Sequence, residues 1–150
     1  MSVDANVSTC ELCALLADSS AASVVLRRTD YAVLLIDDAA YPGFCRVVWH
    51  AHVKEMSDLA PEQRAVLMDA VWQVEAAQRE VLQPHKINLA SLGNMTPHLH
   101  WHVIPRYDDD AHFPNPVWGA AVRATPEDVL ATRRALLPAL RAAIVRRLAA

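Results

Sequence analysis

A chain of 150 residues, 53% of them hydrophobic, is long enough for one domain around a single core. The formal net charge of −3 and the lack of a long basic stretch exclude duplex nucleic acid as a main partner. Apolar runs such as 32–36 are strand-sized, far below the ~20 residues of a membrane-spanning helix, so we expect no membrane span. Three cysteines without a secretory signal indicate a reducing compartment, and we expect a cytoplasmic protein.

The first half of the chain predicts a hairpin and a long helix. Residues 31–37 are apolar and β-prone and predict a strand, and residues 45–53 predict a second strand after the turn signal Pro42-Gly43. Pro61 suits the first turn of a helix over 61–82, where apolar residues recur at three- and four-residue steps.

The second half predicts two more strands and a helical end. We place the strands at 86–91 and 99–104, the latter ended by Pro105. Thr125 is the expected cap of a helix that runs toward the C-terminus and that Pro138 should kink or split. Strands followed by helices, without strict alternation, favour an antiparallel α+β fold. We treat 1–150 as a single domain, with 119–150 as a helical extension.

The run His-Leu-His-Trp-His-Val-Ile at 98–104 contains three histidines at strict alternation. Alternate side chains of a strand share a face, so His98, His100 and His102 should line one face, with an apolar face behind them. A purely structural role is disfavoured because three imidazoles need three sets of partners, whereas a purely metal-binding pair stays open. Catalysis fits best, since a neutral imidazole attacks phosphorus well near pH 7.

This heptapeptide matches the histidine-triad pattern His-φ-His-φ-His-φ-φ, with φ apolar, at every position. Together with Pro105-Arg106, the preceding helix and the segment 86–94, it makes residues 10–118 resemble the histidine-triad (HIT) family, and in particular bacterial HIT-like hydrolases. The resemblance implies a HIT-like fold: a sheet of about five strands, one long helix before the catalytic strand and a C-terminal helix. It also implies a homodimer that takes a small nucleotide and needs no organic cofactor.

The resemblance assigns a role to each histidine of the triad. His100 is the nucleophile, which forms a nucleotidyl-histidine intermediate that water hydrolyses. His102 contacts the α-phosphate or the bridging leaving group, and His98 supports His100 directly or through a structural metal.

The resemblance also implies nucleotide contacts, with some departures from the family. Asp37 matches the ribose-binding position, Asn88 a position near the phosphate, and Asn94 the phosphate loop, although turn formation is an alternative role for Asp37 and Asn94. Many members carry a hydroxyl residue after the phosphate-loop glutamine; here Met95 follows Asn94, and Thr96 could supply the hydroxyl. Phe44 stands where many members have a histidine.

These departures leave the substrate open between a nucleoside phosphoramidate and a dinucleoside polyphosphate such as diadenosine tetraphosphate. Two other functions stay open. One is a nucleotidyl transferase, and the other is a zinc-stabilised nucleotide-binding or protein-interaction module with little turnover.

Cys10-x-x-Cys13 supplies two of the four ligands that a zinc site needs. Alone, the two cysteines could instead serve only as small apolar side chains near a terminus. This chain resembles a branch of the family in which such a cysteine pair binds zinc together with two histidines. These are the first histidine of the triad and a histidine at the end of the second strand. The matching set is Cys10, Cys13, His52 and His98, which would hold a structural zinc ion. His50 is the alternative to His52, because residues two apart share a face of a strand.

Overall fold

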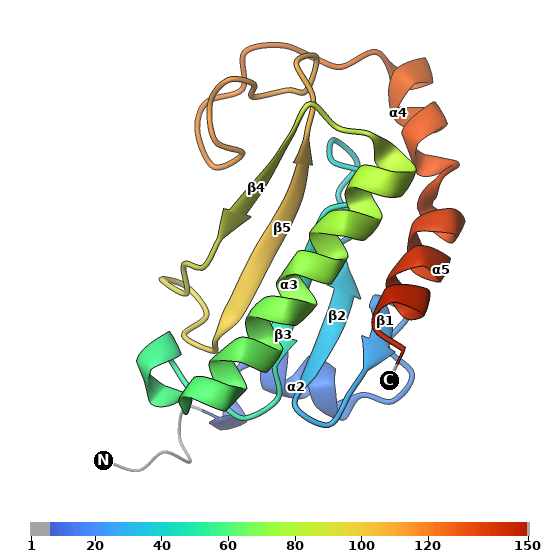
Figure 1. The fold of residues 1–150 in the computed structure, drawn as a ribbon. Helices are drawn as coiled ribbons and strands as arrows, with labels where there is room; N and C mark the ends of the chain where they lie inside the picture. Colours follow the sequence, from blue (N-terminus) through green and yellow to red (C-terminus); the bar gives the residue numbers. More distant parts are fainter. Residues whose placement is uncertain (1–6, 150) are drawn as a thin grey trace.

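The computed structural model describes residues 7–149 and contains one five-stranded sheet with helices packed on it (Figure 1). The sheet order is β1-β2-β3-β5-β4, and every neighbouring pair is antiparallel. The strands are β1 (Val24–Arg27), β2 (Tyr31–Leu35), β3 (Cys45–Trp49), β4 (Lys86–Ala90) and β5 (His100–Arg106). The predicted α+β class and the sheet of about five strands are therefore confirmed.

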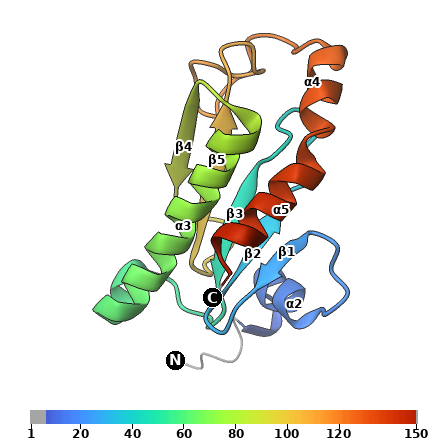
Figure 2. The ribbon, with the colours of Figure 1, turned by 45° about the vertical axis from the view of Figure 1, so that its right-hand side comes forward.

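Helices lie on both faces of the sheet, but the long ones share one face (Figures 1 and 2). α3 and α5 pack on that face, and the short α2 packs on the other against Leu34 and Val48. No helix within 7–149 is both long and apolar enough to cross a membrane. The helices are α2 (Glu11–Ala17), α3 (Pro61–Leu82), α4 (Glu127–Arg134) and α5 (Leu137–Arg147), with a 3-10 turn η1 (Met56–Asp58).

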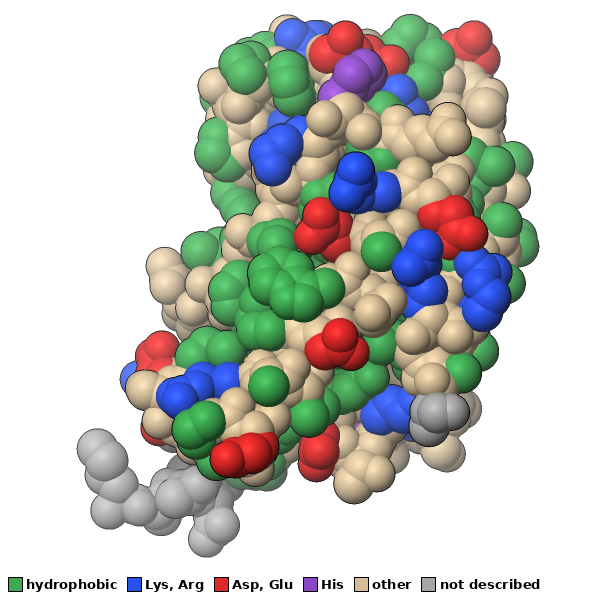
Figure 3. All heavy atoms as spheres, viewed as in Figure 1, with side chains coloured by type: hydrophobic (Ala, Val, Ile, Leu, Met, Phe, Trp, Pro, Cys, Tyr) green, Lys and Arg blue, Asp and Glu red, His purple; other side chains and the backbone are tan. Residues whose placement is uncertain are grey.

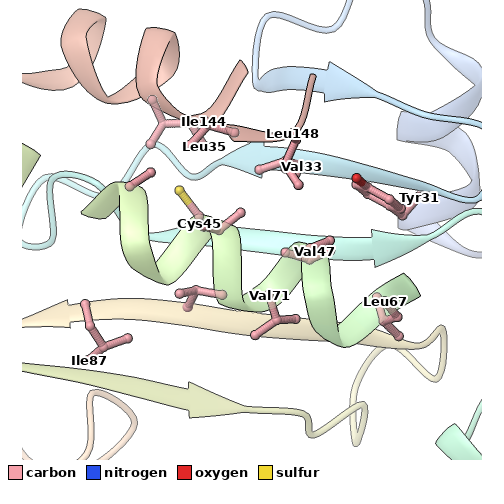
Figure 4. Close-up of a cluster of buried hydrophobic side chains, with 14 of the residues drawn as sticks. Tyr31, Val33, Leu35, Cys45, Val47, Leu67, Val71, Ile87, Ile144 and Leu148 are labelled. Atoms are coloured by element: carbon pink, nitrogen blue, oxygen red, sulfur yellow. The ribbon is translucent and has the colours of Figure 1, made fainter. Parts of the chain in front are cut away.

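The main core lies between the sheet and the helices α3 and α5, and Figure 4 shows part of it. The predicted apolar stripe of α3 is buried there, except that Val81 is only partly covered. Gln78 interrupts the stripe: its Nε2 donates to the carbonyl oxygens of Gly43 and Val103, at 2.8 Å each. This side chain therefore ties α3 to the start of β3 and to the middle of β5.

The short elements β1, α2 and η1 were not predicted, and two local expectations are wrong. β1 and α2 are short, with four and seven residues, so neither carries a clear period. β5 continues through Pro105, because β3 pairs with β5 only as far as Val103 and needs no N–H there. Thr125 does not cap α4; its hydroxyl donates to the carbonyl oxygen of Asp109 at 2.7 Å, and Pro126 is the residue before the helix.

The helical end of the chain divides as expected. α4 and α5 are separate helices, and Pro138 lies in the first turn of α5, where its missing N–H costs nothing. Figure 1 shows both helices running down one side of the sheet toward the C-terminus, beside α3. The residues of α5 that pack into the core are Leu140, Ala143 and Ile144.

Candidate active site

The three histidines of the triad lie on one face of the sheet, opposite α3. His98 directly precedes β5, and His100 and His102 belong to it. All three are buried, with exposed fractions of 1%, 6% and 5%. In the neighbouring strand β3, Val48 pairs with His100 and Arg46 pairs with His102. The alternation of the sequence therefore does place the imidazoles in one row.

The hydrogen bond of His100 defines which ring nitrogen is free. Its Nδ1 lies 2.5 Å from the carbonyl oxygen of His98, which can only accept, so Nδ1 carries the proton. The Nε2 atom then keeps its lone pair. Burial lowers the pKa of His100, the carbonyl of His98 opposes this shift, and the charge of Arg46 adds to it. A neutral ring with a free Nε2 is the form that can attack phosphorus.

His102 is packed between aromatic rings and a cation. Its ring centroid lies 4.9 Å from that of His100, 5.0 Å from Trp118 and 5.7 Å from Phe44. The Nε atom of Arg46 donates to Nδ1 of His102 at 3.4 Å, so the ring proton belongs on Nε2. Burial lowers the pKa of His102 to about 4, with the charges of His100 and Arg46 adding to the effect.

A cavity of about 220 Å³ opens in front of these two histidines. Asn94 and Thr96 belong to the loop on one of its walls, so the structure brings these two predicted nucleotide contacts next to His100 and His102. Trp118 is 52% exposed at the same cavity. The remaining lining residues are Glu11, Leu12, Arg46, Leu92, Gly93 and Met95.

Two predicted nucleotide contacts lie elsewhere. The Oδ1 atom of Asn88 accepts a hydrogen bond from Nη1 of Arg106 at 2.7 Å, and Asn88 does not line the cavity. Asp37 is exposed and lines a second cleft, of about 770 Å³, between the end of β2 and the helices α4 and α5. β2 ends at Leu35, and residues 36–38, which follow it, line this second cleft.

Four side chains meet where α2 approaches the start of β5: Cys10, Cys13, His52 and His98. Their ligand atoms all lie within 4.8 Å of one another. Nδ1 of His98 lies 3.5 Å from Sγ of Cys10, 3.4 Å from Sγ of Cys13 and 3.2 Å from Nδ1 of His52. A tetrahedral zinc ion with ordinary bond lengths separates its ligand atoms by roughly 3.3–3.8 Å, so this donor set fits zinc.

The surroundings of this cluster also suit a metal. Nε2 of His98 lies 2.6 Å from the carbonyl oxygen of Trp49, which accepts a hydrogen bond from Nε2–H, so Nδ1 is left free to bind an ion. Cys10 caps α2, and its Sγ accepts from the backbone N–H of Cys13, so one helical turn points both sulfurs at the histidines. His52, rather than His50, belongs to the cluster.

Sequence reasoning missed two residues of the cavity. Arg46 is the one member of β3 that is not buried, and a charged residue in an apolar strand was the available signal. Trp118 lies in the irregular segment after β5, far along the chain from the other lining residues, and its ring contacts His102.

The chain belongs to the HIT family, because its sequence matches the HIT domain over residues 18–109. It is 33% identical over 101 residues to a protein of Mycobacterium tuberculosis named AP-4-A phosphorylase, an alignment that covers 63% of this chain. The chain spans about half the length of that relative, of which 51% is covered.

Solved structures of the same family share the fold. A histidine triad protein from Bradyrhizobium japonicum is 30% identical, with a TM-score of 0.67 over 84% of this chain and 91% of that one. A zinc-bound histidine triad family protein from Mycobacterium smegmatis is 20% identical, with a TM-score of 0.65 over 93% of this chain and 96% of that one.

Proposed function

We propose that this chain cleaves dinucleoside polyphosphates, such as diadenosine tetraphosphate, at the α-phosphate through a nucleotidyl intermediate on His100. The observation that carries the proposal is the bond from Nδ1 of His100 to the carbonyl of His98, which leaves Nε2 free at the cavity. The relative named AP-4-A phosphorylase favours this substrate class over nucleoside phosphoramidates.

In the first step Nε2 of His100 forms a bond to the α-phosphorus, and the bond from phosphorus to the bridging oxygen breaks. The electron pair leaves on that oxygen, with the remainder of the polyphosphate. The Nε2–H of His102 and the side chains of Asn94 and Thr96 would donate hydrogen bonds to phosphate oxygens, which their place in the lining of the cavity supports. In the second step water attacks the phosphorus, and His100 departs to release a nucleoside monophosphate.

Inorganic phosphate is a second candidate acceptor for the nucleotidyl group. The name of the Mycobacterium tuberculosis relative favours it. The first step is then the same, and the product of the second step is a nucleoside diphosphate rather than a monophosphate. With phosphate as the acceptor, the protein would be a nucleotidyl transferase rather than a hydrolase.

The cysteine–histidine cluster has a structural role in this proposal. A zinc ion there would hold Cys10 and Cys13, at the start of α2, against His98 at the start of β5. Glu11 and Leu12 of α2 line the cavity, so the same tether keeps one wall of the site in place.

The test is to incubate the protein with diadenosine tetraphosphate, with and without inorganic phosphate, and to separate the nucleotides. We expect ATP with AMP when water is the acceptor, and ATP with ADP when phosphate is. His100→Ala should lower the rate by about 10⁴-fold or more, because the nucleophile is lost. His85→Ala is the control, since that side chain is 56% exposed and outside the cavity.

Equal rates from the wild type and His100→Ala would contradict the proposal. So would the formation of two ADP molecules in the absence of phosphate, since that product requires attack away from the α-phosphorus. Tight binding with no turnover would instead support the zinc-stabilised binding module.

A further inference from the structure

Arg46 is a cation on the sheet face that carries the triad. It lies in the middle of the sheet, paired with Leu34 of β2 on one side and with His102 of β5 on the other. The other residues of β3, Cys45–Trp49, are all buried. Placing a guanidinium among buried residues costs free energy unless it forms an ion pair with an anion or donates to a hydrogen-bond acceptor.

The hydrogen bonds of Arg46 leave most of its donors free. Its Nε donates to Nδ1 of His102, and none of the described residues 7–149 accepts a hydrogen bond from either terminal nitrogen. None of the carboxylates in that range forms an ion pair with it. The guanidinium lines the same cavity as His100, where the only other charged lining residue is Glu11 of α2, which forms no ion pair with it.

Burial lowers the pKa of Arg46 and the charge of Glu11 partly restores it, so the side chain stays a cation at every physiological pH. The cavity therefore holds a permanent positive charge with a free fork of N–H donors. This geometry matches the oxygens of a phosphate group.

The two substrate classes left open by the sequence differ in what their leaving group needs. An amine that leaves phosphorus must gain a proton, whereas a phosphate leaves as an anion and needs a positive charge. Arg46 supplies charge but no proton. His102 is poorly suited to supply one, because the titratable or charged groups that face it are Arg46 from β3 and His100 from β5, and its other ring neighbours are Phe44 and Trp118. No carboxylate among these neighbours stabilises a protonated ring, so His102 donates a hydrogen bond from a neutral ring.

We propose that Arg46 binds the departing phosphate and makes this site selective for substrates in which the group expelled from the α-phosphorus is itself a phosphate. The proposal rests on the proposed function, because it assumes attack by His100. Nε of Arg46 holds His102 as an Nε2–H donor, and the two terminal nitrogens bind the leaving phosphate. As the bond to phosphorus breaks, the electron pair stays on the bridging oxygen, whose new charge the guanidinium stabilises without a proton transfer.

The experiment compares kcat/KM for diadenosine tetraphosphate and for an adenosine phosphoramidate with a neutral amine leaving group. Arg46→Met should lower kcat/KM about 100-fold for the tetraphosphate and less than about fivefold for the phosphoramidate. Arg46→Lys, which keeps the charge but loses the fork and the bond to His102, should lie between the wild type and Arg46→Met. Arg79→Met is the matched control, because this arginine is exposed on α3 and outside the cavity.

Two further measurements separate the failure of this proposal from that of the proposed function. In the His100→Ala background, which abolishes attack, Arg46→Met should still weaken binding of the tetraphosphate about tenfold more than binding of the phosphoramidate. The ¹⁵N shifts of the His102 ring should report an Nε2–H tautomer in the wild type and a mixture of tautomers in Arg46→Met.

Equal losses for both substrates, or no loss for either, would overturn the role of Arg46. An unchanged His102 tautomer would overturn the positioning part of the proposal. Wild-type protein that turns over neither substrate, but whose tetraphosphate binding depends on Arg46, would overturn the proposed function and the leaving-group role, and would leave only phosphate binding by Arg46 supported.

Discussion

At the scale of single residues, the site is organised by which nitrogen of each histidine carries its proton. The carbonyl oxygen of Trp49 accepts a hydrogen bond from Nε2–H of His98, and the carbonyl oxygen of His98 accepts one from Nδ1–H of His100. The first ring therefore turns a lone pair toward the cysteines, and the second turns one toward the cavity. His98 therefore contributes its ring to the metal cluster and its backbone carbonyl to the orientation of His100.

Zinc binding is the prediction that belongs to this scale. The wild type should hold about one equivalent of zinc per chain, and Cys13→Ser should hold less than about half an equivalent, because zinc needs its fourth strong ligand. Cys45→Ala is the matched control, since Cys45 is buried in the core and outside the cluster. Metal analysis after exhaustive dialysis measures this, and equal zinc in all three proteins would rule the cluster out.

The sequence could predict the triad because alternation along one strand is a local property. It could predict the metal set only through a family resemblance, since Cys10 and His98 are 88 positions apart. Arg46 was not predicted because its place in the site depends on the neighbouring strand. Only the register of β3 with β5 puts it beside His102. Asp37 was assigned to the ribose only through the same family resemblance; it lies at the second cleft, and its contact with a nucleotide stays a prediction.

At the scale of elements, the segment after β5 is held by a buried ion pair. Nε and Nη2 of Arg106 donate to the two carboxylate oxygens of Asp110, at 2.7 and 3.0 Å, and the two residues are 2% and 1% exposed. Nη2 of Arg106 also donates to the carbonyl of Asn115 at 2.7 Å. This network fixes the loop that carries Trp118 back to His102.

Removing the carboxylate of Asp110 should therefore destabilise the fold. Asp110→Ala leaves Arg106 buried without its counter-charge, and we expect a loss of about 3–5 kcal/mol in the free energy of unfolding, measured by urea titration. Asp108→Ala is the control, because that side chain is 67% exposed. A loss below about 1 kcal/mol would contradict the account of this ion pair.

The same ion pair has a consequence for acid stability. Burial opposes ionisation of Asp110, but the bonds from Arg106 and from three backbone N–H groups outweigh it and lower the pKa of Asp110 to about 2. Because the folded pKa lies below the unfolded value of about 3.9, the stabilisation is complete above about pH 4 and is lost as the pH falls toward 2. Asp110→Ala should flatten this part of the stability curve.

At the scale of the whole molecule, the sheet separates two functions. The face covered by α3 and α5 holds the main core, and the opposite face carries the triad, the metal cluster and Arg46. Figure 3, which faces α3, shows hydrophobic side chains gathered over this helix. Val66 and Trp72 of α3 are 42% and 49% exposed. The homodimer implied by the family resemblance stays a prediction, which sedimentation velocity tests directly.

The overall fold was easier to predict than the details of the site. Long elements such as α3 can be predicted from the sequence because buried apolar residues recur along them at the period of the helix. The short elements β1 and α2 are stabilised mainly by partners elsewhere in the chain, such as β2, Leu34 and Val48. The cavity is built from four separate segments, so its composition appears only once they are folded together.

The central claim is that His100 carries the nucleotidyl group during the reaction. The most direct test is to stop the reaction rapidly, without acid, and to look for this group on the protein. The protein is mixed with diadenosine tetraphosphate, stopped within one turnover, digested, and its peptides are analysed by mass spectrometry. The account predicts an adenylyl group on His100 that forms and decays as fast as product appears, and none in His100→Ala. An adenylyl group on another residue, or turnover of the wild type with no adduct at any time, would contradict it.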